Sequence, residues 1–139
     1  MAKRIVGFSV PGDPVPQPRA RVTTRHGIAR AYVPKSSPIH AYRSSIAEAA
    51  KQAGSVVTDS VYAVTIVATF ARKPSHMNKS GLKKTAPALP RADVDNIAKA
   101  VLDALHGVAW HDDKQVESLA VKKTYGAEGK TEVLIETHP

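Results

Sequence analysis

Five charged side chains in the C-terminal third have the types and spacing to hold a metal ion and act on a phosphate. Asp93 and Asp95 stand two residues apart, and Lys99 follows four residues after the second of them. A second acidic pair, Asp112 and Asp113, comes after an intervening apolar segment. Carboxylate ligands without cysteine suit Mg²⁺ or Mn²⁺ far better than Zn²⁺. The chemistry that they suggest is phosphodiester hydrolysis, in which a metal activates water and Lys99 stabilises charge on the phosphate or positions the water.

The same residues allow a purely structural interpretation. Asp93 and Asp95 lie at the entrance of a helical pattern, where acidic side chains often cap the helix and complement its dipole. Lys99 and Asp103 continue the i, i+4 spacing from Asp95 and are typical of a surface ladder of ion pairs. The second acidic pair fits an ordinary turn. From spacing alone, both interpretations stay open.

The elements that must position these residues follow from the hydrophobic pattern. Apolar positions at helical spacing predict one helix after Ser37 and Pro38, ending at Gly54, and a second over 94–105. Strands are predicted at 5–10, 28–33, 61–70, 115–125 and 131–137. Because 61–70 is apolar on both faces, we expect it to be central and buried on both sides. The pattern predicts one α/β (α+β) domain over 1–139, with a mixed sheet and two main helices.

The charge distribution indicates a polyanionic partner, most simply nucleic acid. Twenty Lys and Arg against 12 Asp and Glu leave +8 in total. Residues 1–90 carry 14 − 3 = +11, and residues 91–139 carry 6 − 9 = −3. A Pro-rich basic arm (11–27) and a basic loop (71–90) hold the candidate phosphate contacts. These are Arg19, Arg21, Arg25, Lys73, Lys79, Lys83 and Lys84.

Several classes of protein are disfavoured by the composition. The chain has no cysteine, which excludes disulfides, thiol catalysis and thiolate metal sites and favours a cytoplasmic location. The alternative polyanion is an anionic membrane surface. No apolar run approaches the roughly 20 residues of a spanning helix, so no membrane partner is expected.

A gap-free stretch of the sequence matches a known pattern. Its parts are Asp93-Val94-Asp95-Asn96-Ile97, Lys99, Leu102-Asp103-Ala104-Leu105, Trp110-His111-Asp112-Asp113 and Gln115-Val116. This stretch resembles the RusA family of Holliday junction resolvases. A Pro-rich segment with arginines (14–21) and a lysine at Lys122 or Lys123 agree more loosely. His111 and the long loop 71–90 depart from the pattern.

The resemblance implies a homodimeric, Mg²⁺-dependent endonuclease that nicks four-way DNA junctions symmetrically, in DNA recombination and repair. Mn²⁺ is the alternative metal, and no small-molecule cofactor is expected. Asp93, Asp95 and Asp113 correspond to catalytic, metal-binding carboxylates, and Lys99 corresponds to the catalytic lysine. Asp112 corresponds to an auxiliary ligand or a support for the ligands. The expected location is a bacterial cytoplasm, with the gene cellular or phage-borne.

Two other functions fit the residues. One is a non-catalytic, basic nucleic-acid-binding protein in which the acids are only caps and ion-pair partners. The other is a nuclease for other branched DNA or for RNA.

Overall fold

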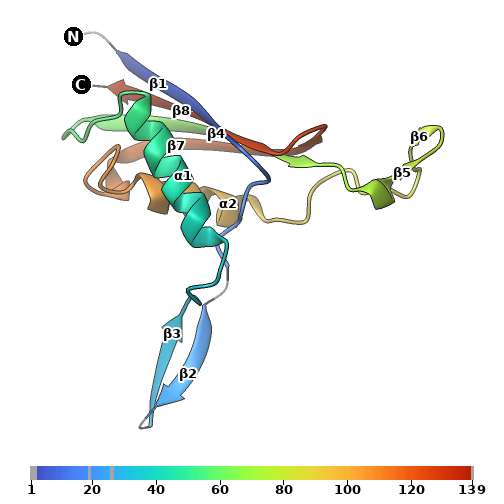
Figure 1. Cartoon of the computed structure of the whole chain (residues 1–139). Coiled ribbons are helices and arrows are strands. Elements are labelled where there is room, and N and C mark those ends of the chain that lie inside the picture. The colour runs from blue at the N-terminus through green and yellow to red at the C-terminus, as the bar shows by residue number, and fades with distance from the viewer. Residues whose placement is uncertain (1–2, 19, 26, 139) are drawn as a thin grey trace.

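A four-stranded mixed sheet forms the centre of the molecule. The computed structural model describes residues 3–18, 20–25 and 27–138. The sheet has the order β1–β8–β4–β7 (Figure 1). Its strands are β1 (Arg4–Pro11), β4 (Val61–Ala71), β7 (Val116–Gly126) and β8 (Lys130–His138). β8 pairs antiparallel with β1 and β4, whereas β4 and β7 run parallel.

Two helices pack on one face of this sheet, α1 (Ile39–Gln52) and α2 (Val94–Leu105) (Figure 1). Ser37 Oγ accepts a hydrogen bond from the backbone N–H of Ile39 at 3.3 Å, and Gly54 follows α1 at φ +95°. The predicted bounds of the second helix are confirmed. Within the described ranges, no helix has the length and hydropathy to cross a membrane. The mixed sheet with two helices confirms the predicted fold class.

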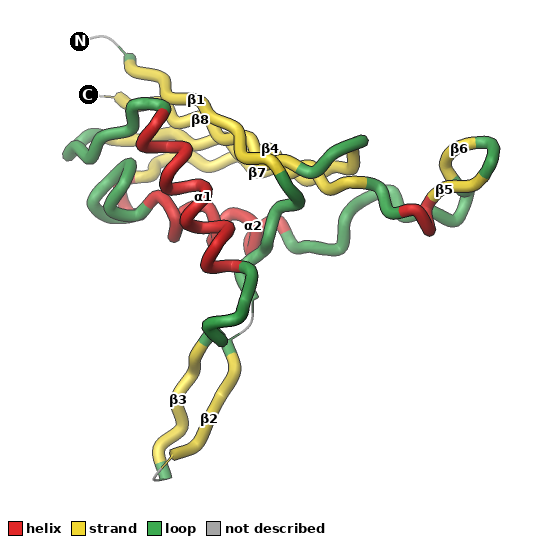
Figure 2. Tube along the Cα trace, viewed as in Figure 1, coloured by secondary structure: helices red, strands yellow, loops and turns green. Residues whose placement is uncertain are grey.

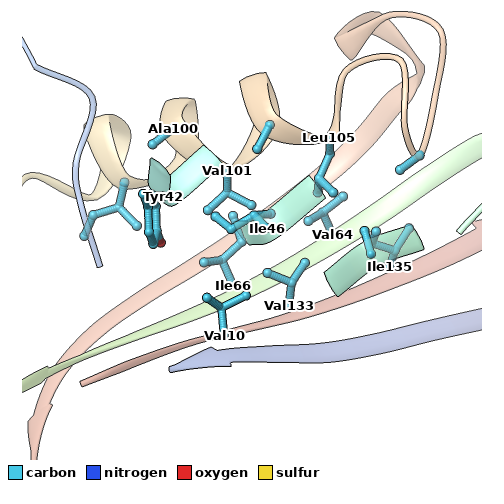
Figure 3. Packing of buried hydrophobic residues seen from close by; sticks show 14 of the residues in the cluster. Val10, Tyr42, Ile46, Val64, Ile66, Ala100, Val101, Leu105, Val133 and Ile135 are labelled. Atoms are coloured by element: carbon cyan, nitrogen blue, oxygen red, sulfur yellow. The ribbon is translucent and has the colours of Figure 1, made fainter. Parts of the chain in front are cut away.

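The core lies between the helices and the covered face of the sheet (Figure 3). Every second residue of a strand packs against buried residues of the helices, because successive side chains point to opposite faces of the sheet. The cluster includes Ile46, Val64, Ile66, Val101, Leu105, Val133 and Ile135. The expectation that strand 61–70 is buried on both sides is wrong. β4 is central, but Val61 and Thr65 on its other face are exposed, because both helices pack on the same side.

Two hairpins extend from the compact body (Figure 2). The first consists of β2 (Arg21–Arg25) and β3 (Ile28–Tyr32), which pair antiparallel and include part of the predicted basic arm. The second lies in the predicted loop 71–90, which contains the 3₁₀ turn η1 (Pro74–His76) and the short strands β5 (Met77–Asn78) and β6 (Gly81–Leu82). The basic segments therefore form two extensions that leave the core in different directions (Figure 2).

The connection from β4 to β7 sets the position of the acidic residues. Parallel strands need a crossover, and α2 supplies it. α2 begins near the carboxyl end of β4 and returns toward the amino end of β7. A turn and the 3₁₀ segment η2 (Asp113–Gln115) then lead into that strand (Figure 1). The two acidic pairs therefore lie at opposite ends of one helix.

Candidate active site

Asp93 and Asp95 lie at the N-terminal end of α2, and both residues are exposed. Asp93 is the N-cap residue with an extended backbone, but its side chain makes no capping hydrogen bond. Asp95 Oδ1 accepts the backbone N–H of Asn96 at 2.9 Å. Residues two apart lie within about 7 Å along the chain, so one hard cation could contact both carboxylates. The Asp93 side chain therefore does not cap the helix, contrary to the structural interpretation of the sequence.

Two contacts hold the backbone on either side of this carboxylate pair. Lys123 Nζ donates a hydrogen bond to the carbonyl of Ala92 at 2.9 Å, from β7. The backbone N–H of Gln17 donates to the carbonyl of Asn96 at 2.9 Å, from the basic arm. The sheet and the arm therefore both fix the entry into α2, and the two carboxylates stand on a supported backbone.

The middle of α2 carries Lys99 and Asp103, which the sequence predicted to share a helix face. Lys99 Nζ lies 3.8 Å from Asp103 Oδ2, and Arg43 Nη2 of α1 lies 3.2 Å from the same oxygen. Arg43 also donates to Gln17 Oε1. In the described part of the chain, no ion pair joins Lys99 to Asp95. Asp103 therefore links the two helices, while 62% of the Lys99 side chain remains exposed.

Asp113 lies at the C-terminal end of α2, fixed by a buried tryptophan. Trp110 Nε1 donates a hydrogen bond to Asp113 Oδ1 at 2.8 Å, and His106 Nδ1 is 3.7 Å from the same oxygen. Trp110 is fully buried and packs against Tyr62 with ring centroids 5.5 Å apart. The Asp113 side chain is 41% exposed, so one carboxylate oxygen is held while the group still reaches solvent.

The neighbouring Asp112 has a structural role in the same turn. Its Oδ1 accepts the backbone N–H of Lys114 at 3.0 Å, which caps η2. Gln115 Oε1 accepts the backbone N–H of His111 and of Asp112 at 2.8 and 3.1 Å. The Gln115 amide donates to the carbonyl of Thr58 at 2.8 Å and to that of Ser60 at 2.9 Å. The turn is thereby tied to the segment before β4.

Within one chain, the two acidic pairs are far apart. The 12 residues of α2 span about 18 Å at 1.5 Å each. From Val116, beside Asp113, to Lys123, beside Ala92, β7 spans about 23 Å at roughly 3.3 Å per residue. Across residues 3–18, 20–25 and 27–138, no three His, Asp or Glu side chains gather as a metal site. One chain therefore places Asp93 and Asp95 together and Asp113 elsewhere.

The predicted phosphate contacts lie on the two extensions. Lys73, Lys79 and Lys84 are exposed and Lys83 is half-buried. Arg21 and Arg25 contribute their backbones to β2, and their side chains lie outside the described part of the chain, as does the whole of Arg19. The described lysines can therefore contact the phosphates of a polyanion that extends beyond the compact body.

A cluster beside Asp93 was missed in the sequence. The Arg72 guanidinium carbon lies 3.9 Å from the ring centroid of Tyr125, and His76 contacts the same ring edge-on at 5.4 Å. Desolvation and the charges of Arg72, Lys73 and Lys83 lower the pKa of His76. These side chains come from the segment just after β4 and from the end of β7, which are far apart in the sequence and are brought together by strand pairing. No local sequence pattern could therefore predict the cluster.

The comparison with known families assigns the chain. The family model described as endodeoxyribonuclease RusA matches residues 11–136. The protein belongs to the RusA family. An uncharacterized protein of Bacillus subtilis (strain 168), YqaN, is 31% identical over 134 residues, covering 94% of each chain. RusA-family membership assigns DNA as the partner and the general nuclease reaction, and it confirms the resemblance seen in residues 93–116.

Proposed function

We propose that this RusA-family protein is a Mg²⁺-dependent Holliday junction resolvase that acts as a homodimer in DNA recombination and repair. The observation that carries the proposal is the exposed carboxylate pair of Asp93 and Asp95, in a chain that matches the family over 11–136. Neither side chain is occupied by a cap or an ion pair among the described contacts. Two adjacent, unneutralised carboxylates in a DNA-binding protein are well suited to a cation and a phosphate.

The donor set fits Mg²⁺, with Mn²⁺ as the alternative. Asp93 and Asp95 offer hard oxygen ligands, and Mg²⁺ typically uses one or two carboxylates together with waters and phosphate oxygens. When bound, the metal would activate water and neutralise charge on the phosphate. Lys99 stands one helical turn beyond Asp95 with an exposed ammonium, in reach of a phosphate at this end of α2.

A homodimer would account for the distance between the acids. Asp95, Lys99, Leu102 and His106 are exposed or half-exposed and follow one face of α2. If a two-fold axis perpendicular to α2 passes near the middle of this face, the α2 helices of two copies run antiparallel. The Asp93 and Asp95 end of one copy then faces the Asp113 end of the other. Each of two symmetric sites would take two carboxylates from one chain and Asp113 from its partner.

The two-fold arrangement also matches the substrate. A four-way junction has two-fold symmetry, and paired nicks require two sites related by the same symmetry. The basic arm and the basic loop extend from the core toward the surrounding duplexes, whose phosphates attract such charge. DNA contacts would then come from the extensions and cutting from α2.

The first experiment incubates the protein with a labelled four-way junction and a matched linear duplex, with Mg²⁺, Mn²⁺ or EDTA. We expect paired nicks in the junction with either metal, none with EDTA, and none in the duplex. Asp93→Asn should abolish nicking, while Glu117→Gln, an exposed carboxylate of β7 outside both acidic pairs, should cut like wild type. Binding without nicking in either metal would instead support a non-catalytic nucleic-acid-binding protein.

A complementation experiment tests the shared site. Asp93→Asn/Asp95→Asn protein and Asp113→Asn protein, each inactive alone, are mixed and allowed to exchange subunits. Heterodimers would hold one fully wild-type site, so an equal mixture should recover about a quarter of wild-type nicking. A mixture as inactive as its components would show that each site takes its acids from one chain.

A further inference from the structure

A pocket of about 570 Å³ opens beside the carboxylate pair, at the carboxyl edge of the parallel strands β4 and β7. Its walls come from the end of β4, the end of β7, η1 and residues 90–92. Ala92 lines the pocket and is followed directly by Asp93. The volume lies within the roughly 300–1,000 Å³ of ordinary ligand sites. A DNA strand whose phosphate lies at Asp93 would therefore pass the mouth of this pocket.

One wall is a flat surface fixed by its neighbours. Tyr125 lines the pocket, with Arg72 stacked over one face of its ring and His76 in a T-shaped arrangement with it at an interplanar angle of 77°. Arg72 Nη1 is itself held by a hydrogen bond to the carbonyl of Pro87 at 2.6 Å. Phe70 lines the same pocket and packs against the core. Planar aromatic walls of this kind favour a planar, apolar-faced ligand such as a nucleobase.

The acidic group of the pocket favours a base over a phosphate at its own position. Asp13 lines the pocket, and its Oδ1 accepts the backbone N–H of Ala71 at 2.9 Å. A carboxylate has further acceptor positions, which would repel a phosphate but accept an amino group. The side chain is set firmly, because it lies against Gly129, where an added Cβ would come within 2.1 Å of Asp13 Oδ1.

His76 places a hydrogen-bond donor in the same pocket as the acceptor Asp13. The backbone N–H of Lys73 donates to His76 Nδ1 at 3.2 Å, so the proton of the neutral ring lies on Nε2. The lowered pKa favours this neutral form at neutral pH. Lys73 and Arg91 also line the pocket and can hold the phosphates on either side of a base.

We propose that this pocket binds one unstacked nucleobase of the strand being cut, next to the phosphate at Asp93 and Asp95. Asp13 and His76 select bases with an exocyclic amino group, which adenine, cytosine and guanine have and thymine lacks. A base costs least to unstack where its pairing or stacking is already weakened, as at the branch point of a junction. The inference rests on the proposed nuclease function and gives it a sequence preference.

The first test measures single-turnover nicking of junctions that differ only in the nucleotide flanking the cut. We expect thymine at one flanking position to be nicked about tenfold more slowly than the other three bases. Asp13→Asn keeps an oxygen for Ala71 and adds an N–H₂ donor, so it should remove or reverse this preference. Glu128→Gln, a carboxylate at the neighbouring turn that does not line the pocket, should leave the preference unchanged.

Two nicking results would overturn the proposal. One is equal wild-type rates for all four bases and for an abasic nucleotide at each flanking position. The other is an Asp13→Asn protein that slows every junction by the same factor, which would make Asp13 a general structural residue.

A binding test separates this inference from the nuclease function. Junctions carrying 2-aminopurine at each flanking position are bound by Asp93→Asn protein without metal. A base held against Tyr125 should change its fluorescence at one position only, and Tyr125→Leu should abolish that change. No change at any position would overturn the pocket assignment even if wild type cuts junctions. A localised change without any nicking by wild type would instead sustain the pocket and refute the nuclease function.

Discussion

The two ends of α2 present the same functional group in two different environments. At the N-terminal end, Asp93 and Asp95 are exposed and their side chains make almost no contacts with the rest of the fold. At the C-terminal end, Asp113 is bonded to the buried Trp110, and Asp112 caps η2. Carboxylates left free by the fold are available to a ligand at no cost in stability, whereas Asp113 is oriented by the fold and still has a side chain that is 41% exposed. The difference separates acids that serve only a ligand from acids that also support the fold.

The largest expected effect lies at the C-terminal end. Trp110→Ala removes a fully buried side chain from the core and the donor to Asp113, which should lower the free energy of unfolding by about 3–5 kcal/mol. Val94→Ala, at the exposed N-terminal end, should change it by less than about 0.5 kcal/mol. Urea unfolding of both proteins measures the contrast. Equal losses would show that the two ends are anchored alike.

The next effect lies at the N-terminal end and concerns activity. Asp95→Asn should slow junction nicking by at least about a hundredfold, the upper range for residues that only orient a metal ligand. The free energy of unfolding should stay the same or rise, since one of two neighbouring negative charges is removed. Nicking and urea unfolding are measured on the same preparation. A variant that cuts normally would remove Asp95 from the site.

Metal binding should stabilise the folded protein through the carboxylates at the N-terminal end of α2. Mn²⁺ at about a hundred times its Kd should stabilise the wild-type protein by roughly 2.7 kcal/mol, because it binds only the folded state. The thermal midpoint should rise with Mn²⁺ and fall back with EDTA. Asp93→Asn/Asp95→Asn protein should show no such rise. A wild-type midpoint that ignores Mn²⁺ would contradict a metal site at this end.

A smaller effect distinguishes the two roles considered for Asp112. Asp112→Ala removes the cap of η2 and should cost about 1 kcal/mol of unfolding free energy, with little change in nicking. Chemical unfolding and junction nicking are compared with those of Asp95→Asn. If nicking falls as far as it does in Asp95→Asn, Asp112 is an auxiliary metal ligand.

The smallest effect is the titration of His76, which lines the pocket beside the N-terminal end of α2. Its pKa should lie below the ordinary 6.5, because desolvation and nearby cations disfavour the charged ring. Its contribution to stability is therefore present above pH 6.5 and is lost as the pH falls below 6.5 and through the lowered pKa of the folded state. Proton NMR of the ring measures the pKa, and Lys83→Ala should raise it. A midpoint at or above 6.5 would contradict the environment described for the pocket.

Local patterns predicted much of the fold and named the acidic residues that stay candidates for the site. The apolar spacing of Ile97, Val101 and Leu105 gave the bounds of α2, because one helical face must meet the core. The strands at both ends of the chain follow from alternation in the same way. The prediction that strand 61–70 is buried on both sides was wrong. β4 has apolar residues on both faces, but the helices cover only one of them.

The arrangement of the site could not be predicted from those patterns. Asp95 and Asp113 belong to one continuous motif, which suggests that they meet. The parallel pairing of β4 and β7 sends α2 from the carboxyl ends of these strands back toward their amino ends. This path separates Asp95 from Asp113 by the length of the helix. The cluster of Arg72, His76 and Tyr125 likewise depends on two strand ends that pair from distant parts of the chain.

The sequence alone determined the family resemblance, the fold class and the basic character, and it named the candidate metal-binding carboxylates, because residue types and local spacing carry that information. The tertiary structure decided which carboxylates are free, that the two acidic pairs lie at opposite ends of α2, and that a pocket adjoins Asp93. The physical reason is that strand order and pairing direction arise from contacts between residues far apart in the chain, which local periodicity does not specify.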